Sequence, residues 1–283
     1  MRLLWILCLV WVPVPPAQAD VYFEEERINP GFGKSRTGAR TTQHAVYTRG
    51  PVQKVDSRML VDRDMERALQ RQGHTLRSGT LLDLEKAEVF EMNFDDQTVV
   101  RSRIPARSQG AAKSAPTRDQ AVGHPTSFTL SATGERSAVA GIPCRRVIAQ
   151  MRTRHAASTG IQRENRYTYD ACIADAFAGW SELEAFQTRQ DTSTSYPTIV
   201  GGGLDPLRSR AQDIDRLEEE LRDMDAHLNG FALRSTLTAS ARPNSSAGWS
   251  EVFRLERRVK ALRHAPLPDS VFTVPKTLTR VDK

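Results

Sequence analysis

Three consecutive glycines, Gly201, Gly202 and Gly203, lie in the stretch "TIVGGGLDP" and raise the question of nucleotide binding. Glycine-rich turns after an apolar run can hold a phosphate group at the start of a helix. The dinucleotide fingerprint Gly-x-Gly-x-x-Gly fails here because position 206 is proline, and no Gly-Lys-Ser/Thr follows to make a P-loop. We therefore interpret the triplet as a hinge before the next helix, and we predict no cofactor.

Residue patterns typical of hydrolases and metalloenzymes are absent from the sequence. There is no Gly-x-Ser-x-Gly elbow and no His-Glu-x-x-His motif. The acidic pairs Asp62/Asp64 and Asp95/Asp96 are better explained as turn formers. Histidines show no metal-ligand spacing, so we expect them to be surface or turn residues: His44, His74, His124, His155, His227 and His264. The sequence predicts a protein that is not an enzyme, and a hydrolase is the least supported hypothesis.

The N-terminus has the three parts of a secretory signal peptide. Arg2 supplies a positive charge, residues 3–12 are apolar, and Ala17-Gln18-Ala19 is an Ala-x-Ala cleavage site. The apolar run is shorter than the ~20 residues of a membrane span. We expect residues 1–19 to be removed, leaving a periplasmic or secreted chain, residues 20–283, that does not span a membrane.

Two cysteines, Cys144 and Cys172, remain after removal of Cys8 with the signal peptide. In an oxidising compartment an even pair favours a disulfide. The alternative is a nucleophilic or metal-binding thiol, but no Cys-x-x-Cys motif or nearby histidine supports it.

Basic residues are clustered on two segments that we expect to be strands, in a chain of formal net charge +6. If these strands are neighbours, their cations can form a positive face for lipid head groups or an acidic partner. The alternative is an ordinary solvated surface. Aromatic residues do not alternate with the cations, so no nucleic-acid partner is predicted. The two clusters are Arg145, Arg146, Arg152 and Arg154, and Arg254, Arg257, Arg258, Lys260 and Arg263.

Short strands with period-two apolar patterns dominate the sequence and are separated by turn residues. Helical patterns interrupt them at residues 63–71, 175–188 and 207–228. Residues 103–125 are rich in Ala, Ser, Gly and Pro, which indicates a flexible loop. This order predicts a single α+β domain of mostly antiparallel strands.

The segment 207–228 carries apolar residues seven apart at Leu207, Ile214, Leu221 and Leu228. This spacing is compatible with packing on the protein's own sheet or with a dimer through a coiled coil. Packing on the sheet is favoured because coiled coils usually need three to four sustained heptads. The oligomeric state is not determined by this pattern.

Several motifs resemble uncharacterised exported domains of the periplasmic lipoprotein-carrier (LolA/LolB-like) half-barrel superfamily. The resemblance spans most of residues 20–281 through short elements, of which the tail and "GIPC" are the more specific. These elements are "TLLDLEKAEVFEMNFDDQTVV", "GERSAVAGIPCRRVIAQM", "YDACIADAFAGW", "NGFALRS" and "LPDSVFTVPKTLTRV". It implies an antiparallel β half-barrel with helices covering its concave face.

In the lipoprotein carriers, the concave side receives acyl chains. The resemblance therefore implies an exported binding module that holds a lipid, an acyl chain or a lipidated partner under its helices. The alternative is a structural or interaction protein of the cell envelope. Such a protein would dock a protein partner through the helix 207–228 or the arginine-rich strand faces.

Overall fold

The computed structural model describes residues 19–31, 39–104, 124–156, 162–193, 230–242 and 247–281. The proposed signal peptide up to residue 18, the glycine hinge at 201–203 and the helix 207–228 lie outside the described residues. So do residues 105–123 of the predicted loop. The two ends of that loop prediction are wrong, because Arg103 ends one strand, and His124 and Pro125 belong to another.

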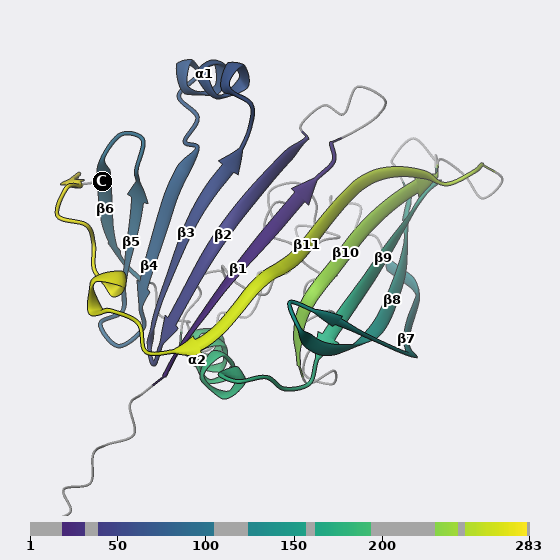
Figure 1. The fold of residues 1–283 in the computed structure, drawn as a ribbon. Coiled ribbons are helices and arrows are strands. Elements are labelled where there is room, and N and C mark those ends of the chain that lie inside the picture. The colour runs from purple at the N-terminus through teal and green to yellow at the C-terminus, as the bar shows by residue number, and fades with distance from the viewer. Residues whose placement is uncertain are drawn as a thin grey trace, which may run out of the picture.

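One open sheet contains all twelve described strands, in the order β12-β6-β5-β4-β3-β2-β1-β11-β10-β9-β8-β7 (Figure 1). Every pairing is antiparallel except β12 with β6. The strands are β1 Asp20–Asn29, β2 Arg40–Arg49, β3 Val52–Leu60, β4 Arg77–Asp83, β5 Glu88–Asn93, β6 Thr98–Arg103, β7 His124–Val139, β8 Ile142–Ala156, β9 Gln162–Ala174, β10 Phe231–Arg242, β11 Ser250–Ala265 and β12 Thr279–Arg280.

Two α-helices accompany the described part of the sheet, as an α+β arrangement requires. The helix α1 spans Arg63–Arg71, as predicted, and Asp62 caps it by accepting a hydrogen bond from the backbone N–H of Met65. The helix α2 spans Trp180–Ser193, later than the predicted 175–188. A 3-10 turn, η2, covers Asp269–Phe272 in the C-terminal tail.

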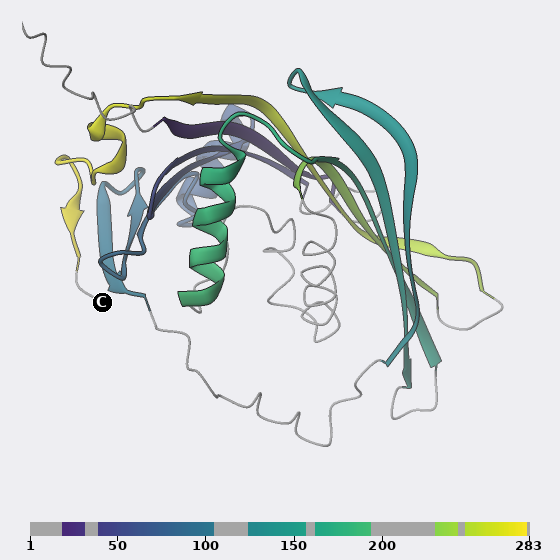
Figure 2. The same ribbon diagram turned by 90° about the horizontal axis from the view of Figure 1, so that it is seen from below.

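The sheet is strongly curved, and α2 lies on its concave side (Figure 2). Leu183 and Phe186 of α2 are fully buried against apolar residues of the sheet. By contrast, α1 lies at one end of β3 and β4 and buries none of its residues (Figure 1). Of the described helices, α2 alone therefore lies on the concave side of the sheet (Figure 2).

Apolar side chains of the sheet form two large buried clusters. The first, called here the β8–β11 cluster, contains Val147, Ala149, Met151, Tyr167, Ala171, Ile173, Leu237, Ala239, Phe253 and Leu255. The second, called here the α2 cluster, contains Val21, Phe23, Val46, Val55, Val139, Cys144, Cys172, Ala174, Leu183, Phe231, Leu233 and Val259.

The convex side of the sheet is covered in part by the C-terminal tail, residues 266–281. Val274 and Leu278 of the tail pack against Leu81, Met92 and Val99 of β4, β5 and β6. Leu81 is next to Leu82, which packs with Phe186 of α2. Successive residues of a strand point to opposite faces, so the tail covers the face opposite to α2.

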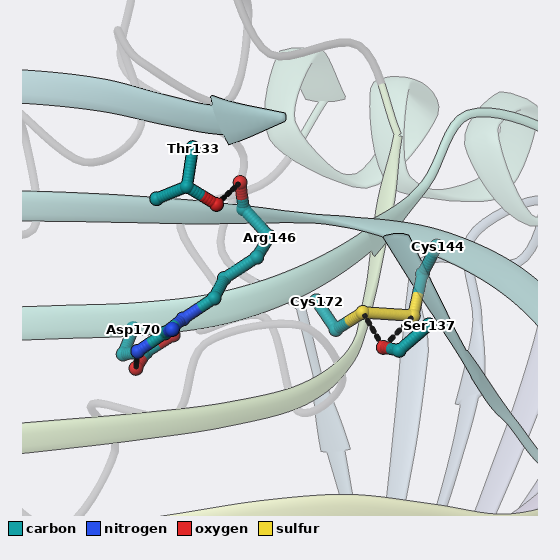
Figure 3. The surroundings of a disulfide bond; sticks show 6 residues. All are labelled: Thr133, Ser137, Cys144, Arg146, Asp170 and Cys172. Carbon is teal, nitrogen blue, oxygen red and sulfur yellow. Dashed lines mark hydrogen bonds and ion pairs between the residues drawn. A yellow bond between two sulfur atoms is a disulfide. The ribbon is translucent and has the colours of Figure 1, made fainter. Parts of the chain in front are cut away.

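A disulfide joins Cys144 of β8 to Cys172 of β9, as the compartment argument predicted (Figure 3). Their Cα atoms are 5.3 Å apart, a separation that suits a disulfide without backbone movement. Ser137 of β7 lies against both sulfur atoms, with its Oγ 3.0 Å from Cys172 Sγ. The bond therefore links β8 and β9 covalently at one end of the sheet, and Ser137 brings β7 into contact with it.

Candidate ligand-binding site on the concave face

A row of polar side chains crosses the concave face beside the α2 cluster. Glu25 of β1 lies opposite His44 of β2, which lies opposite Ser57 of β3. Glu25 is two residues after Phe23, and the alternation of strand side chains places it on the same face. The row therefore lies on the face that α2 contacts.

Two arginines hold the Glu25 carboxylate in this row. Arg257 Nε donates to Glu25 Oε2 at 2.6 Å, and Arg27 Nε donates to Oε1 at 2.7 Å. The side chains of Glu25 and Arg257 are 0% and 2% exposed, so this ion pair is shielded from water. Beyond the carboxylate, His44 Nδ1 lies 2.8 Å from Ser57 Oγ.

The electrostatics of this row keep Glu25 charged and His44 neutral. Burial alone would raise the pKa of the Glu25 carboxyl, but the charges of Arg257 and Arg27 lower it to about 2. Burial lowers the pKa of the His44 imidazole to about 4, and the charge of Arg27 acts in the same direction. Near neutral pH, the charged Glu25 carboxylate therefore accepts hydrogen bonds from both guanidinium groups beside a neutral His44.

Arg257 has hydrogen-bonding capacity that the described residues do not use. Its Nη1 donates to the carbonyl oxygen of Ala232 at 2.8 Å, and its guanidinium lies 4.9 Å from the centroid of the Phe231 ring. Its Nη2 is buried and has no hydrogen-bond partner in the described part of the chain. An unpaired buried donor on a charged group is costly, and a ligand oxygen is one way to satisfy it.

The charged row separates the two apolar clusters. Along β11, Leu255 of the β8–β11 cluster lies two residues before Arg257, and Val259 of the α2 cluster lies two residues after it. On β10, buried Ser235 lies opposite Arg257, between Leu233 and Leu237. A buried cationic donor thus has buried apolar side chains on both sides, so that a charged group and apolar groups are adjacent, as in the binding of an amphipathic anion.

Stability alone gives little reason to bury these charges. Replacing a buried ion pair by apolar residues of similar volume is often neutral or stabilising, because both charges lose their hydration. Glu25 and Arg257 occupy positions where the alternating pattern places apolar residues such as Phe23 and Leu255. We therefore treat the group Glu25, Arg27 and Arg257 as a candidate binding site.

The predicted arginine face on β8 is divided between the two sides of the sheet. Arg145 and Arg146 are consecutive in a regularly paired strand, so they point to opposite faces. Arg146 contacts Asp170 at 2.6 Å (Figure 3). It also contacts Glu135 at 2.8 Å, and Arg145 contacts Asp175. Arg152 is exposed on β8, and the side chain of Arg154 lies outside the described ones.

The two arginine-rich strands are not neighbours, contrary to the condition for a joint positive face. β9 and β10 lie between β8 and β11. Within the second cluster Arg257 is buried, and Lys260 contacts Glu26 at 2.7 Å. Arg258 and Arg263 are exposed. The cations of β11 are therefore split between an internal ion pair and the surface.

Sequence reasoning missed the Glu25–Arg257 pair, although a local signal for it exists. Phe253, Leu255, Arg257 and Val259 form a period-two pattern in which one apolar position is occupied by arginine. The prediction of surface or turn histidines is wrong for His44, which lies within β2 and is mostly buried. Its partner Ser57 is thirteen residues away on the next strand.

Within the described residues, no group of three or more His, Cys, Asp or Glu side chains is placed to hold a metal ion. No helix among them is long and apolar enough to cross a membrane. The sequence matches no protein-family model, and no curated protein is significantly similar to it.

Proposed function

We propose that this protein is an exported, non-enzymatic binding module that holds an amphipathic anion on its concave face. The ligand class is a lipid, a free acyl chain or the acyl group of a lipidated partner. The buried group Glu25, Arg27 and Arg257 between two apolar clusters carries this proposal. The ligand's anionic group would bind Arg257 Nη2, and its apolar part would lie on the β8–β11 cluster.

The shape of the sheet is compatible with this function. A curved open sheet with α2 on its concave side supports the half-barrel arrangement that the resemblance to lipoprotein carriers implies (Figure 2). Because one fold hosts many functions, the shape alone does not select a ligand. The selection comes from Arg257, whose guanidinium can bind a carboxylate or phosphate oxygen.

Extraction of bound lipid tests the proposal directly. The protein is purified without detergent from the envelope of its own host and examined by native mass spectrometry and organic extraction. We expect a stoichiometric acyl-bearing anion in the wild type. Purified protein that carries no such molecule, and that does not take up a fatty acid added in solution, would contradict the proposal.

Two arginine variants provide the matched comparison on one strand. Arg257→Met removes the buried guanidinium and keeps most of the side-chain volume. Arg254→Met removes a half-exposed guanidinium three residues earlier, whose partner is Glu256. Loss of the bound anion in the first variant alone, with both variants folded, is the expected result. Equal retention in both would show that Arg257 does not bind the ligand.

A further inference from the structure

A groove of about 770 Å³ lies over β1 to β4. Lys54 and Asp56 of its lining alternate with Val55 of the α2 cluster, so the groove is on the convex face, opposite to α2. This volume is typical of a site for a small molecule. Its walls combine charged groups with the apolar surface of Ala45 and Phe94. The polar and charged residues whose positions face it are Glu24, Gln43, Lys54, Asp56, Arg58, Glu66, Arg77 and Lys260. Glu25, His44 and Ser57 also border it, although the alternation of strand residues directs their side chains to the concave face.

Two arginines stand directly opposite each other in this groove. Arg58 of β3 is the cross-strand partner of Arg77 of β4, and both side chains are exposed. Like charges directly opposite on neighbouring strands repel each other. No carboxylate pairs with either of them within the part of the chain that the structure describes. Within the described residues, the positive charges of Arg58 and Arg77 are therefore not balanced by a carboxylate partner.

The other two cations of the groove already have carboxylate partners. Lys260 Nζ lies 2.7 Å from Glu26 Oε2, and Lys54 Nζ lies 3.2 Å from Asp56 Oδ2. The free positive charge of the groove is thus concentrated at Arg58 and Arg77. Arginine pairs are well suited to phosphate groups, because each guanidinium can donate two parallel hydrogen bonds.

An acceptor without a donor lies beside the arginine pair. Asp56 is two residues before Arg58 on the same face of β3, a separation of about 7 Å along the strand. Its Oδ1 is buried and lacks a hydrogen-bond partner among the described residues. If residue 79 had a side chain, its Cβ atom would lie 2.9 Å from Asp56 Oδ1. The glycine at this position therefore leaves space for the oxygen. Glu66 of α1 adds a second carboxylate to the groove.

We propose that this groove binds a small, soluble phosphate ester that carries an amino group. The phosphate would lie between Arg58 and Arg77, and the ammonium group would donate to Asp56. One short zwitterion would then supply an anion to the two arginines and a hydrogen-bond donor to Asp56. The site is separate from the concave face and does not depend on the function proposed for that face.

Isothermal titration of the full chain with phosphoethanolamine tests this site, with inorganic phosphate and ethanolamine as the two half-ligands. We expect phosphoethanolamine to bind saturably at one site. Phosphate should bind more weakly, and ethanolamine should not bind. Arg58→Gln and Arg77→Gln each remove charge-assisted hydrogen bonds and should weaken binding by about tenfold or more. Asp56→Asn should weaken phosphoethanolamine binding and leave phosphate binding unchanged.

The control is Arg234→Gln, which removes an exposed arginine of β10 that does not line the groove. Its affinity for phosphoethanolamine should equal that of the wild type. Equal weakening in Arg234→Gln and Arg58→Gln would show non-specific charge attraction and overturn the proposal. Binding to vesicles of anionic phospholipid without binding to phosphoethanolamine would also overturn it, because the ligand would then be a membrane surface.

Discussion

The carboxylate of Glu25 is bound by two arginines, and the ion pair with Arg257 is almost completely shielded from water. A buried charge that loses its partner keeps its desolvation cost, whereas loss of both charges together removes that cost. The effect of a substitution at Glu25 or Arg257 therefore depends on whether the other charge is still present. This dependence separates the electrostatic effect of the pair from a simple packing effect.

The double substitution of this pair should cost less stability than the single substitution of Arg257. Arg257→Met should lower the free energy of unfolding by about 3–5 kcal/mol, because it removes the most buried of Glu25's partners. Adding Glu25→Met should recover most of this loss. Urea denaturation of the two single variants and the double variant measures the coupling. Additive losses in the double variant would be inconsistent with a mutually compensating pair.

The stability of the fold should fall as the pH is lowered, in two windows. His44 has a folded pKa of about 4 against an ordinary value of 6.5, so the unfolded chain binds an extra proton between these pH values. Glu25 has a folded pKa of about 2 against 4.5, and its contribution is lost between those values. In both cases the unfolded state takes up more protons, which lowers stability as the pH falls.

The variant His44→Gln isolates the first window because glutamine does not titrate. We expect the free energy of unfolding of the wild type to decrease from pH 6.5 to pH 4, and that of the variant to decrease less. Thermal denaturation at a series of pH values provides the measurement. A parallel decrease in both proteins would exclude His44 as its source.

At the scale of elements, the disulfide stabilises the fold by linking two strands. The bond between Cys144 and Cys172 closes a loop of 28 residues between β8 and β9. On the chain-entropy model, such a loop contributes about 3–4 kcal/mol to stability. Reduction, or the variant Cys144→Ala/Cys172→Ala, should lower the unfolding midpoint in urea accordingly. An unchanged midpoint after complete reduction would contradict this estimate.

The helix α1 should unfold independently of the rest of the sheet. It buries none of its residues, and its start depends on the hydrogen bond from Met65 N–H to Asp62 Oδ1. Asp62→Ala should cost about 1 kcal/mol of helix stability. We expect faster amide hydrogen exchange across residues 63–71, with an unchanged midpoint of global unfolding. A lower global midpoint would show that α1 is coupled to the core.

At the scale of the whole molecule, the first strand and the C-terminal tail are joined by one arginine. Arg49 of β2 donates to Asp20 of β1 at 2.8 Å and to Asp269 of the tail at 2.6 Å. The backbone N–H of Leu267 donates to the same Asp20 carboxylate at 2.7 Å, and the ring of Phe272 lies 4.4 Å from the Arg49 guanidinium. Burial would raise the pKa of Asp20, but these donors hold it below its ordinary value.

Loss of Arg49 should therefore release the tail from the convex face. Arg49→Met removes several charge-assisted hydrogen bonds, and the free energy of opening the tail should fall by about 2 kcal/mol. Hydrogen exchange of residues 266–281 measures this opening. The matched control is Arg101→Met, an exposed arginine of β6 that pairs with Glu88. Similar exchange in both variants would show that Arg49 does not hold the tail.

The element pattern of this protein was largely predictable from local sequence. Alternation identified strands such as β5, and a run of helix-forming residues before Gly73 placed α1 at its observed bounds, whereas Asp62, predicted to be a turn former, caps that helix. The late start of α2 was not predicted. Gly179, just before the helix, has a φ of +91° and packs against Val21 and His264 of the sheet. This contact is between distant segments, so the local sequence does not indicate it. Turn and cap signals are local, so the sequence carries them in full.

The candidate site was not predictable in the same way. The alternation of β1 and β11 shows that Glu25 and Arg257 occupy apolar positions, but not that they meet, since 232 residues separate them. The same limit applies to the arginine clusters, which a sequence pattern cannot place on one face or two. Strand order decides both, because β9 and β10 separate β8 from β11, whereas β1 and β11 are paired.

The sequence by itself therefore determined the strand content, the bounds of α1, and the two cysteines able to form a disulfide. These features depend on side-chain period, turn residues and the number of cysteines, which can be read from short segments. Only the tertiary structure decided which charges are buried together, which arginines remain without a carboxylate and which face the tail covers. Those outcomes depend on the register between distant strands, and register follows from the burial of the whole apolar surface at once.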